Sequence, residues 1–185
     1  MIVDRRTKGV LLENVSMAAI LGLLALLVSA ASMALDSAAD RRDRDAIARL
    51  GGVQASGVAP GSIASSLGRI YTLTRNDKRY YGAVIEVGDQ RGLARVAAII
   101  TADGKLDSAQ VIGIVPPEFP AAADGWFSDF LGKGGDAAFP FWREDSRRPE
   151  TVSGATESFM ATSSALSRLS RSVMAIASAD AGGKK

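Results

Sequence analysis

The residues best suited to chemistry form one run of small and hydroxyl-bearing side chains, Thr151-Val152-Ser153-Gly154-Ala155-Thr156-Glu157-Ser158. The run precedes a segment with helical periodicity, so it predicts a helix start. Unpaired N–H groups and a partial positive charge at such a start favour an anion, and small residues let the backbone approach a phosphate closely. Ser153, Thr156 and Ser158 could donate to phosphate oxygens or be esterified. The alternative is a plain helix cap, in which Ser153 caps the helix and Gly154 and Ala155 begin it.

The composition excludes most other kinds of active site. The chain contains no cysteine and no histidine, which excludes thiolate nucleophiles, iron–sulfur ligation, the Ser-His-Asp triad and most transition-metal sites. No carboxylate pair has a convincing acid–base spacing, so a hydrolase is the least favoured class and neither catalytic nor metal-ligating residues are predicted. Any redox role must therefore depend on an organic cofactor. The 22 basic and 20 acidic residues nearly balance, which gives no reason to expect nucleic-acid binding.

An uncharged run near the N-terminus has the length of a membrane span. No charged residue occurs from 14 to 35, and crossing the roughly 30 Å hydrocarbon core takes about 20 helical residues. We therefore expect a stub at 1–13, a transmembrane helix at 14–35 and a lipid bilayer around it. A buried core helix is one alternative. A cleaved signal peptide is the other, although its apolar core usually covers only about 7–15 residues. Lys and Arg flank the run on both sides, so charge counting does not decide its orientation.

The remaining chain is expected to form a single α+β domain. Residues 36–61 suggest a polar helix and then a linker, because glycine and proline interrupt the pattern. The domain is predicted at 62–178, followed by a flexible tail at 179–185.

Within that domain, β-branched and alternating segments predict an antiparallel sheet with flanking helices. The expected strands are 69–75, 80–87, 94–101 and 106–115. An Asp-Gly pair within 102–105 predicts a hairpin between the last two strands. Aromatic spacing predicts a short helix from Trp126 to Leu131, ended by Gly132. A second helix is predicted from Ser153 onward, with the apolar face Phe159, Leu166, Leu169, Val173 and Ile176.

The run Ser153-Gly154-Ala155-Thr156-Glu157-Ser158 resembles the flavinylation motif of the FMN-binding domain family, Asp-x-x-Ser/Thr-Gly-Ala-Thr-x-Ser/Thr. That family includes the G subunit of the Rnf electron-transport complex and the C subunit of the sodium-translocating NADH:quinone reductase. Its motif threonine carries FMN through a phosphoester bond, which implies covalent FMN on Thr156. The other residues of the implied cofactor site are Ser153, Gly154, Ala155 and Ser158.

The resemblance covers most of the chain and is closest to the G subunit. It includes the N-terminal span, Tyr81-Gly82 in a strand, the 102–105 turn and the segment 126–133. Tyr81 is a candidate for stacking on the flavin. Glu150 stands where the motif usually has Asp. Pro116-Pro117-Glu118-Phe119-Pro120 replaces the family's His-Glu-Thr-Pro-Gly, so that only Glu118 carries over, as a candidate flavin contact.

The resemblance implies a non-catalytic electron-carrier subunit of a membrane-bound, ion-translocating oxidoreductase complex of the Rnf type. Its implied partners are the other membrane subunits of the complex and an FAD-dependent flavin transferase that attaches the cofactor. Its implied location is the bacterial inner membrane, crossed once, with the soluble domain in the periplasm. Two alternatives stay open: a standalone membrane-anchored flavoprotein of another redox chain, and an anchored adaptor without flavin, in which the motif is only a helix cap.

Overall fold

The computed structural model describes residues 23–26, 28–29, 37–64, 68–89, 92–115, 125–140 and 155–182. The chain divides into two compact units, Met1–Arg42 and Asp43–Lys185. Among the described residues, no helix is both long enough and apolar enough to cross a membrane. The span predicted at 14–35 falls mostly outside these residues, since only 23–26 and 28–29 of it are described.

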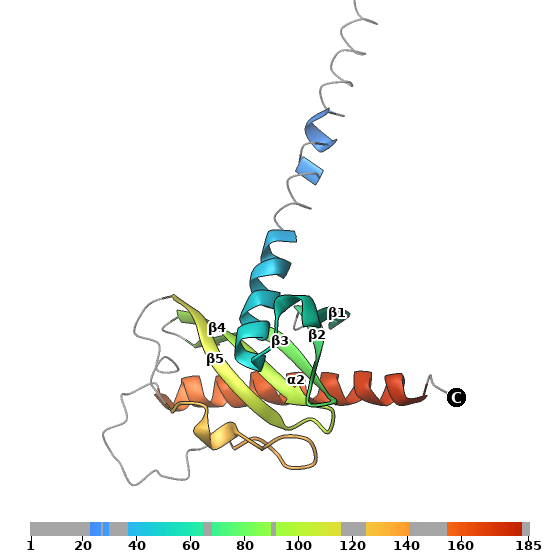
Figure 1. Cartoon of the computed structure of the whole chain (residues 1–185). Coiled ribbons are helices and arrows are strands. Elements are labelled where there is room, and N and C mark those ends of the chain that lie inside the picture. Colours follow the sequence, from blue (N-terminus) through green and yellow to red (C-terminus); the bar gives the residue numbers. More distant parts are fainter. Residues whose placement is uncertain are drawn as a thin grey trace, which may run out of the picture. The chain divides into compact units, whose positions relative to one another are not determined.

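The second unit contains a five-stranded antiparallel sheet in which each strand pairs with the next along the chain (Figure 1). The strands are β1 (Val58–Ala64), β2 (Gly68–Arg75), β3 (Lys78–Asp89), β4 (Gly92–Thr101) and β5 (Leu106–Val115). The predicted antiparallel sheet with flanking helices is confirmed, and four strands lie close to their predicted positions. The strand β1 was not predicted, and it contains Pro60 and Gly61. Proline is tolerated there because β1 is an edge strand and pairs on one side only.

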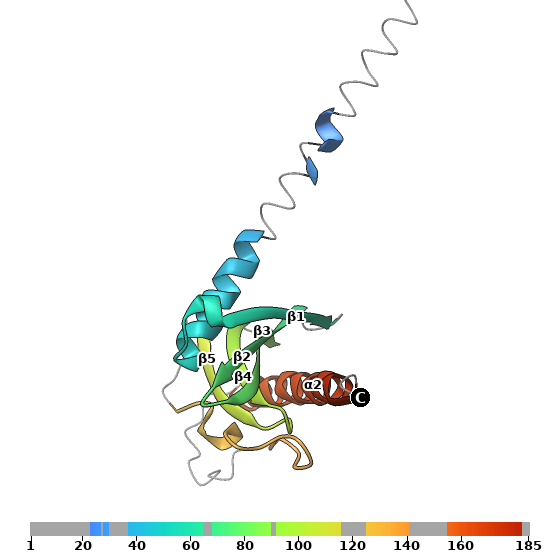
Figure 2. The ribbon, with the colours of Figure 1, turned by 45° about the vertical axis from the view of Figure 1, so that its right-hand side comes forward.

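One face of the sheet packs against the long helix α2 (Ala155–Gly182). In Figures 1 and 2, α2 lies along the sheet in both views. The apolar face predicted for this helix is confirmed by the burial of four of its members, Phe159, Leu166, Leu169 and Val173, while Ile176 is partly buried. Opposite them lie alternate residues of the central strands, including Ile85 and Val87 of β3 and Val96 of β4. This contact supplies the larger of the two hydrophobic cores.

The other face of the sheet is covered by the end of a helix at residues 37–51. Ile47 and Ala48 are buried there with Tyr71, Leu73 and Ile99. Because both faces are covered, β4 is apolar along most of its length instead of alternating. The compact unit therefore begins at Asp43, earlier than the residue 62 suggested by the glycines and proline that follow this helix. A 3-10 turn, η1 (Ala55–Gly57), leads from it into β1.

The aromatic segment predicted as a short helix is a turn followed by a single 3-10 turn, η3 (Ser128–Phe130). Gly125 and Gly132 on either side have positive φ values of 77° and 71°. The backbone hydrogen bonds between them are of the i→i−3 type, since the N–H of Ser128 donates to the Gly125 carbonyl and the N–H of Phe130 to the Phe127 carbonyl, so the segment forms a 3-10 turn and not an α-helix. Its three aromatic side chains, Trp126, Phe127 and Phe130, are buried, whereas Leu131 is exposed.

Candidate functional site

The candidate site is the N-terminal end of α2, which begins at Ala155. Thr156 therefore belongs to the first helical turn, as the sequence predicts, whereas Ser153 and Gly154 lie outside the described residues. The first N–H groups of a helix have no partner within it, and the helix dipole adds a partial positive charge. Glu157, exposed in the same turn, carries an acidic group that suits this dipole. The backbone here can thus accommodate negative charge.

A cluster of aromatic rings supports this end of the helix from inside the domain. The ring of Phe159 lies 4.5 Å from that of Phe130, and the two planes are inclined by 32°. On another side, Trp126 meets Phe159 edge-on with the ring centroids 5.9 Å apart. Edge-to-face and tilted pairs at these distances are favourable. The aromatic segment 126–130 therefore supports the second turn of α2, at Phe159.

Hydrogen bonds at two buried hydroxyl residues, Ser158 and Thr162, also stabilise the N-terminal end of α2. The Oγ1–H of Thr162 donates to the carbonyl oxygen of Ser158 at 2.7 Å, and the indole N–H of Trp126 donates to Thr162 Oγ1 at 3.4 Å. Thr162 is 1% exposed and Ser158 is fully buried. Ser158, proposed from the motif as a phosphate contact, thus lies in the domain interior and not on the outer side of the helix.

Tyr81, the other proposed flavin contact among the described residues, lies at the opposite end of α2. It lines a cavity of about 240 Å³ together with Arg79, Ile176 and Asp180. Positions 156 and 176 are separated by about 30 Å along the helix axis, at 1.5 Å per residue. The structure therefore does not bring Tyr81 together with Thr156. Glu118, the third proposed contact, lies outside the described residues.

Tyr81 is surrounded by side chains of the protein itself. Burial raises the pKa of its phenol, and the nearby Arg79 guanidinium opposes that shift. Arg79 lies over the Tyr81 ring at 5.5 Å and forms an ion pair with Asp180 at 2.8 Å. These contacts join β3 to the C-terminal part of α2, which favours a structural role for this tyrosine.

The β4–β5 hairpin, predicted from its Asp-Gly pair, docks against the middle of α2. Ser170 Oγ donates to the carbonyl of Gly104 at 2.6 Å and accepts the N–H of Gly135 at 3.2 Å. Gly104 has a φ of 85°, and a Cβ atom there would lie 2.8 Å from Ser170 Oγ. Ser170 was not among the residues predicted to be functional. A serine placed between the buried Leu169 and Val173 is the signal that could have identified it.

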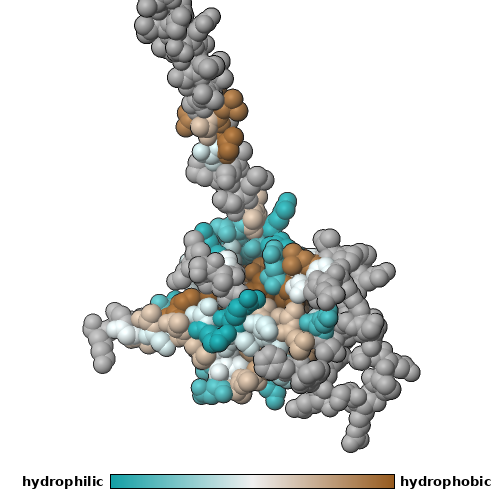
Figure 3. Space-filling model, turned by 180° about the vertical axis from the view of Figure 1, so that it is seen from behind, coloured by the Kyte–Doolittle hydropathy of each residue, from teal (hydrophilic) through white to brown (hydrophobic). Residues whose placement is uncertain are grey.

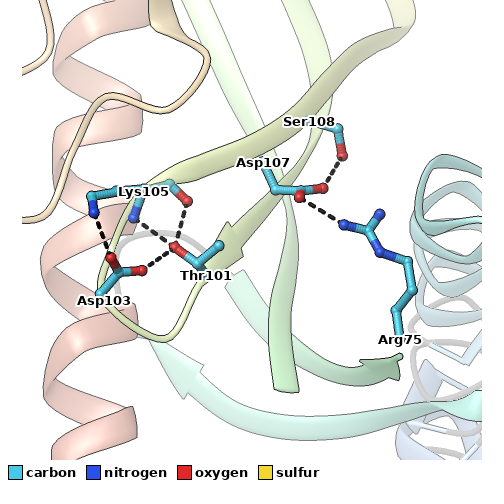
Figure 4. Close-up of polar contacts among 6 residues, drawn as sticks. All are labelled: Arg75, Thr101, Asp103, Lys105, Asp107 and Ser108. Atoms are coloured by element: carbon cyan, nitrogen blue, oxygen red, sulfur yellow. Dashed lines mark hydrogen bonds and ion pairs between the residues drawn. The ribbon is translucent and has the colours of Figure 1, made fainter. Parts of the chain in front are cut away.

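Polar side chains hold the same hairpin on its exposed side (Figure 4). Asp103 accepts from Thr101 Oγ1 at 2.5 Å and pairs with Lys105 at 2.8 Å, and these contacts lower the pKa of its carboxyl group. Arg75 reaches across from β2 to Asp107 at 2.7 Å. The charged groups are thus engaged with one another, which favours a role in fixing the turn.

A second cavity, of about 560 Å³, contains four charged side chains in its lining. They are Asp43, Glu86, Arg95 and Arg168. Asp43 and Arg95 already form an ion pair at 2.7 Å. Two positive and two negative groups give no net charge, so the lining favours no particular class of ligand. Within the described part of the chain, no cluster of three or more acidic residues could hold a metal ion.

Comparison with known protein families finds no family that matches this sequence, and comparison with curated proteins finds no relative.

Proposed function

We propose that this chain is a membrane-anchored electron carrier with FMN bound to Thr156 through a phosphoester. The observation that carries the proposal is that α2 starts with Ala155 and Thr156, the last two residues of the Ser-Gly-Ala-Thr run. A phosphate attached in the first turn meets the free N–H groups and the positive end of the dipole. The aromatic cluster packs against Phe159 in the next turn and would support the attachment point from inside the domain. Bound FMN supplies the redox chemistry, and the protein holds and positions it.

Attachment requires an enzyme, because FMN does not esterify a threonine hydroxyl unaided. A flavin transferase using FAD would form the bond between the Thr156 oxygen and the phosphorus of the FMN half. The FAD diphosphate bond breaks, AMP leaves and the hydroxyl loses its proton, so that no electron is gained or lost. Thr156 is then an attachment point and not a turning-over nucleophile. The protein is accordingly a carrier subunit and not an enzyme in its own right.

The setting that accompanies this proposal is the bacterial inner membrane. The uncharged run 14–35 would cross it once, and the domain that starts at Asp43 would face the periplasm. In that compartment a covalent tether keeps the cofactor from being lost. Its electron-transfer partners would be other membrane subunits of an Rnf-type complex. A standalone anchored flavoprotein of another redox chain is the second candidate, and the same absence of cysteine and histidine favours an organic cofactor there too.

Intact-mass measurement of the full chain, purified from membranes after co-expression with a flavin transferase, tests the proposal. The wild-type mass should exceed that of Thr156→Ala by one FMN moiety beyond the difference due to the substitution. Thr151→Ala is a matched control, since it removes a hydroxyl from the same segment and should retain the flavin. Wild-type protein without the added mass would overturn the proposal and favour the adaptor without flavin.

A further inference from the structure

Met160 is an exposed apolar residue on the outer side of α2, which otherwise carries mainly polar and charged side chains. The exposed positions along this side are Glu157, Met160, Ser164, Arg168 and Arg171. Met160 is 37% exposed and is the only large apolar side chain exposed on the described part of this helix. Among the other described residues of the compact unit, the exposed large apolar ones are Leu93 and Leu131, which are far apart in the sequence. The space-filling view accordingly shows apolar and hydrophilic patches mixed on the face behind that of Figure 1 (Figure 3).

Helical geometry places Met160 beside the proposed attachment point. Residues four apart share a helix face, with Cβ atoms about 5–6 Å apart, so positions 156 and 160 are neighbours. Side chains on an α-helix also tilt toward its N-terminus and cover the turn before their own Cα. The thioether of Met160 therefore extends toward the turn that contains Thr156. A ring tethered at Thr156 would meet this side chain before any other exposed apolar group of α2.

The turn that presents Met160 is held firmly from below. Its neighbour Phe159 is packed between Trp126 and Phe130. Thr162, two residues further on, is tied back to the Ser158 carbonyl. Met160 thus projects from a turn whose inner side is packed and hydrogen-bonded to the domain.

We propose that Met160 is a contact residue for the isoalloxazine ring, an inference that rests on the proposed attachment of FMN to Thr156. Methionine is suited to this contact because its thioether is polarizable and packs favourably against aromatic rings. An aromatic ligand over Met160 would also cover an apolar side chain that the protein itself leaves exposed. The contact would let residue 160 influence the reduction potential, since charge near the ring changes the energy of its more negative reduced form.

Matched charge insertions on the flavinylated full chain test this inference. Met160→Glu places a carboxylate at the proposed contact, and Ser164→Glu places the same charge one turn further along the exposed side. We expect Met160→Glu to shift the flavin midpoint potential to more negative values and to change its visible absorption, with a much smaller change in Ser164→Glu. Equal shifts in the two variants would show a general charge effect and would overturn the contact.

Neutral substitutions keep the test decisive if the glutamate interferes with attachment. Met160→Leu should preserve the apolar contact, whereas Met160→Gln should weaken it and lower the fluorescence anisotropy of the tethered flavin. Intact mass reports separately whether FMN is attached. Wild-type protein without FMN would overturn both proposals, whereas flavinylated Met160→Gln with wild-type anisotropy and potential would overturn only the role of Met160.

Discussion

Ile47 fills the space left by the missing side chain of Gly82. A Cβ atom at position 82 would lie 2.5 Å from Ile47 Cγ2 and 3.3 Å from Cγ1. This glycine on β3 therefore lets the end of the helix at 37–51 approach the sheet closely. The second hydrophobic core, which includes Ile47, Tyr71 and Ile99, depends on that approach.

Gly82→Ala is accordingly expected to destabilise the protein. The new methyl group overlaps a buried branched side chain, and overpacking of this kind usually costs about 1–3 kcal/mol. Urea unfolding of the full chain would measure the loss. Ile47→Ala should also destabilise, but the double variant should lose less than the sum of the two because each change relieves the other's conflict. Additive losses would show that the two residues do not compete for the same space.

Ser170→Ala is expected to reduce stability through two lost hydrogen bonds. The hydroxyl donates to the carbonyl of Gly104 and accepts from the N–H of Gly135. These two glycines belong to different loops that pack against α2. Leaving buried polar groups without partners costs about 1–3 kcal/mol. Ser178, which is exposed on the same helix, provides the control, since Ser178→Ala should leave the unfolding midpoint almost unchanged. Similar midpoints for the two variants would contradict the role of Ser170.

Asp77→Gly is expected to stabilise the β2–β3 hairpin. Asn76 and Asp77 both have left-handed backbone conformations, with φ values of 52° and 59°. Tight hairpin turns of this kind favour glycine at the second position. A residue with a Cβ atom pays about 1–2 kcal/mol for the left-handed conformation, and glycine avoids this cost. Glycine in turn loses about 0.5–1 kcal/mol of stability because its unfolded chain has more conformational freedom. The net gain should be about 0.5 kcal/mol in thermal unfolding, whereas Asp77→Ala, which gives up the short polar side chain, should be less stable than the wild type.

Much of this architecture could be predicted from the sequence, because strand and helix patterns depend on local spacing. The strand at Leu106–Val115 and the apolar face around Leu166 and Leu169 follow from such periodicity. The proline-containing strand β1 was missed because its pairing, and not its composition, makes it a strand.

The same limit applied to the candidate site. The motif located the start of α2, whereas the inward orientation of Ser158 and the distant position of Tyr81 depend on how α2 crosses the sheet. The crossing depends on packing between residues far apart in the chain, such as Trp126 and Phe159. A motif alone gives no information about such contacts.

The raised pKa of Tyr81 gives a prediction at alkaline pH. Burial raises the pKa of this phenol in the folded protein above the ordinary value of 10.0. The unfolded chain therefore loses the proton first, so the contribution of Tyr81 is fully present below about pH 10 and is lost as the pH rises through the folded-state pKa. Tyr81→Phe removes the ionising group, so its stability should fall less steeply above pH 10 than that of the wild type. Urea unfolding across this range, with phenolate absorbance recorded in parallel, measures both effects. Tyr80→Phe is the control, since Tyr80 is only partly buried on the other side of the same strand, and an equal effect of the two substitutions would contradict the assignment to Tyr81.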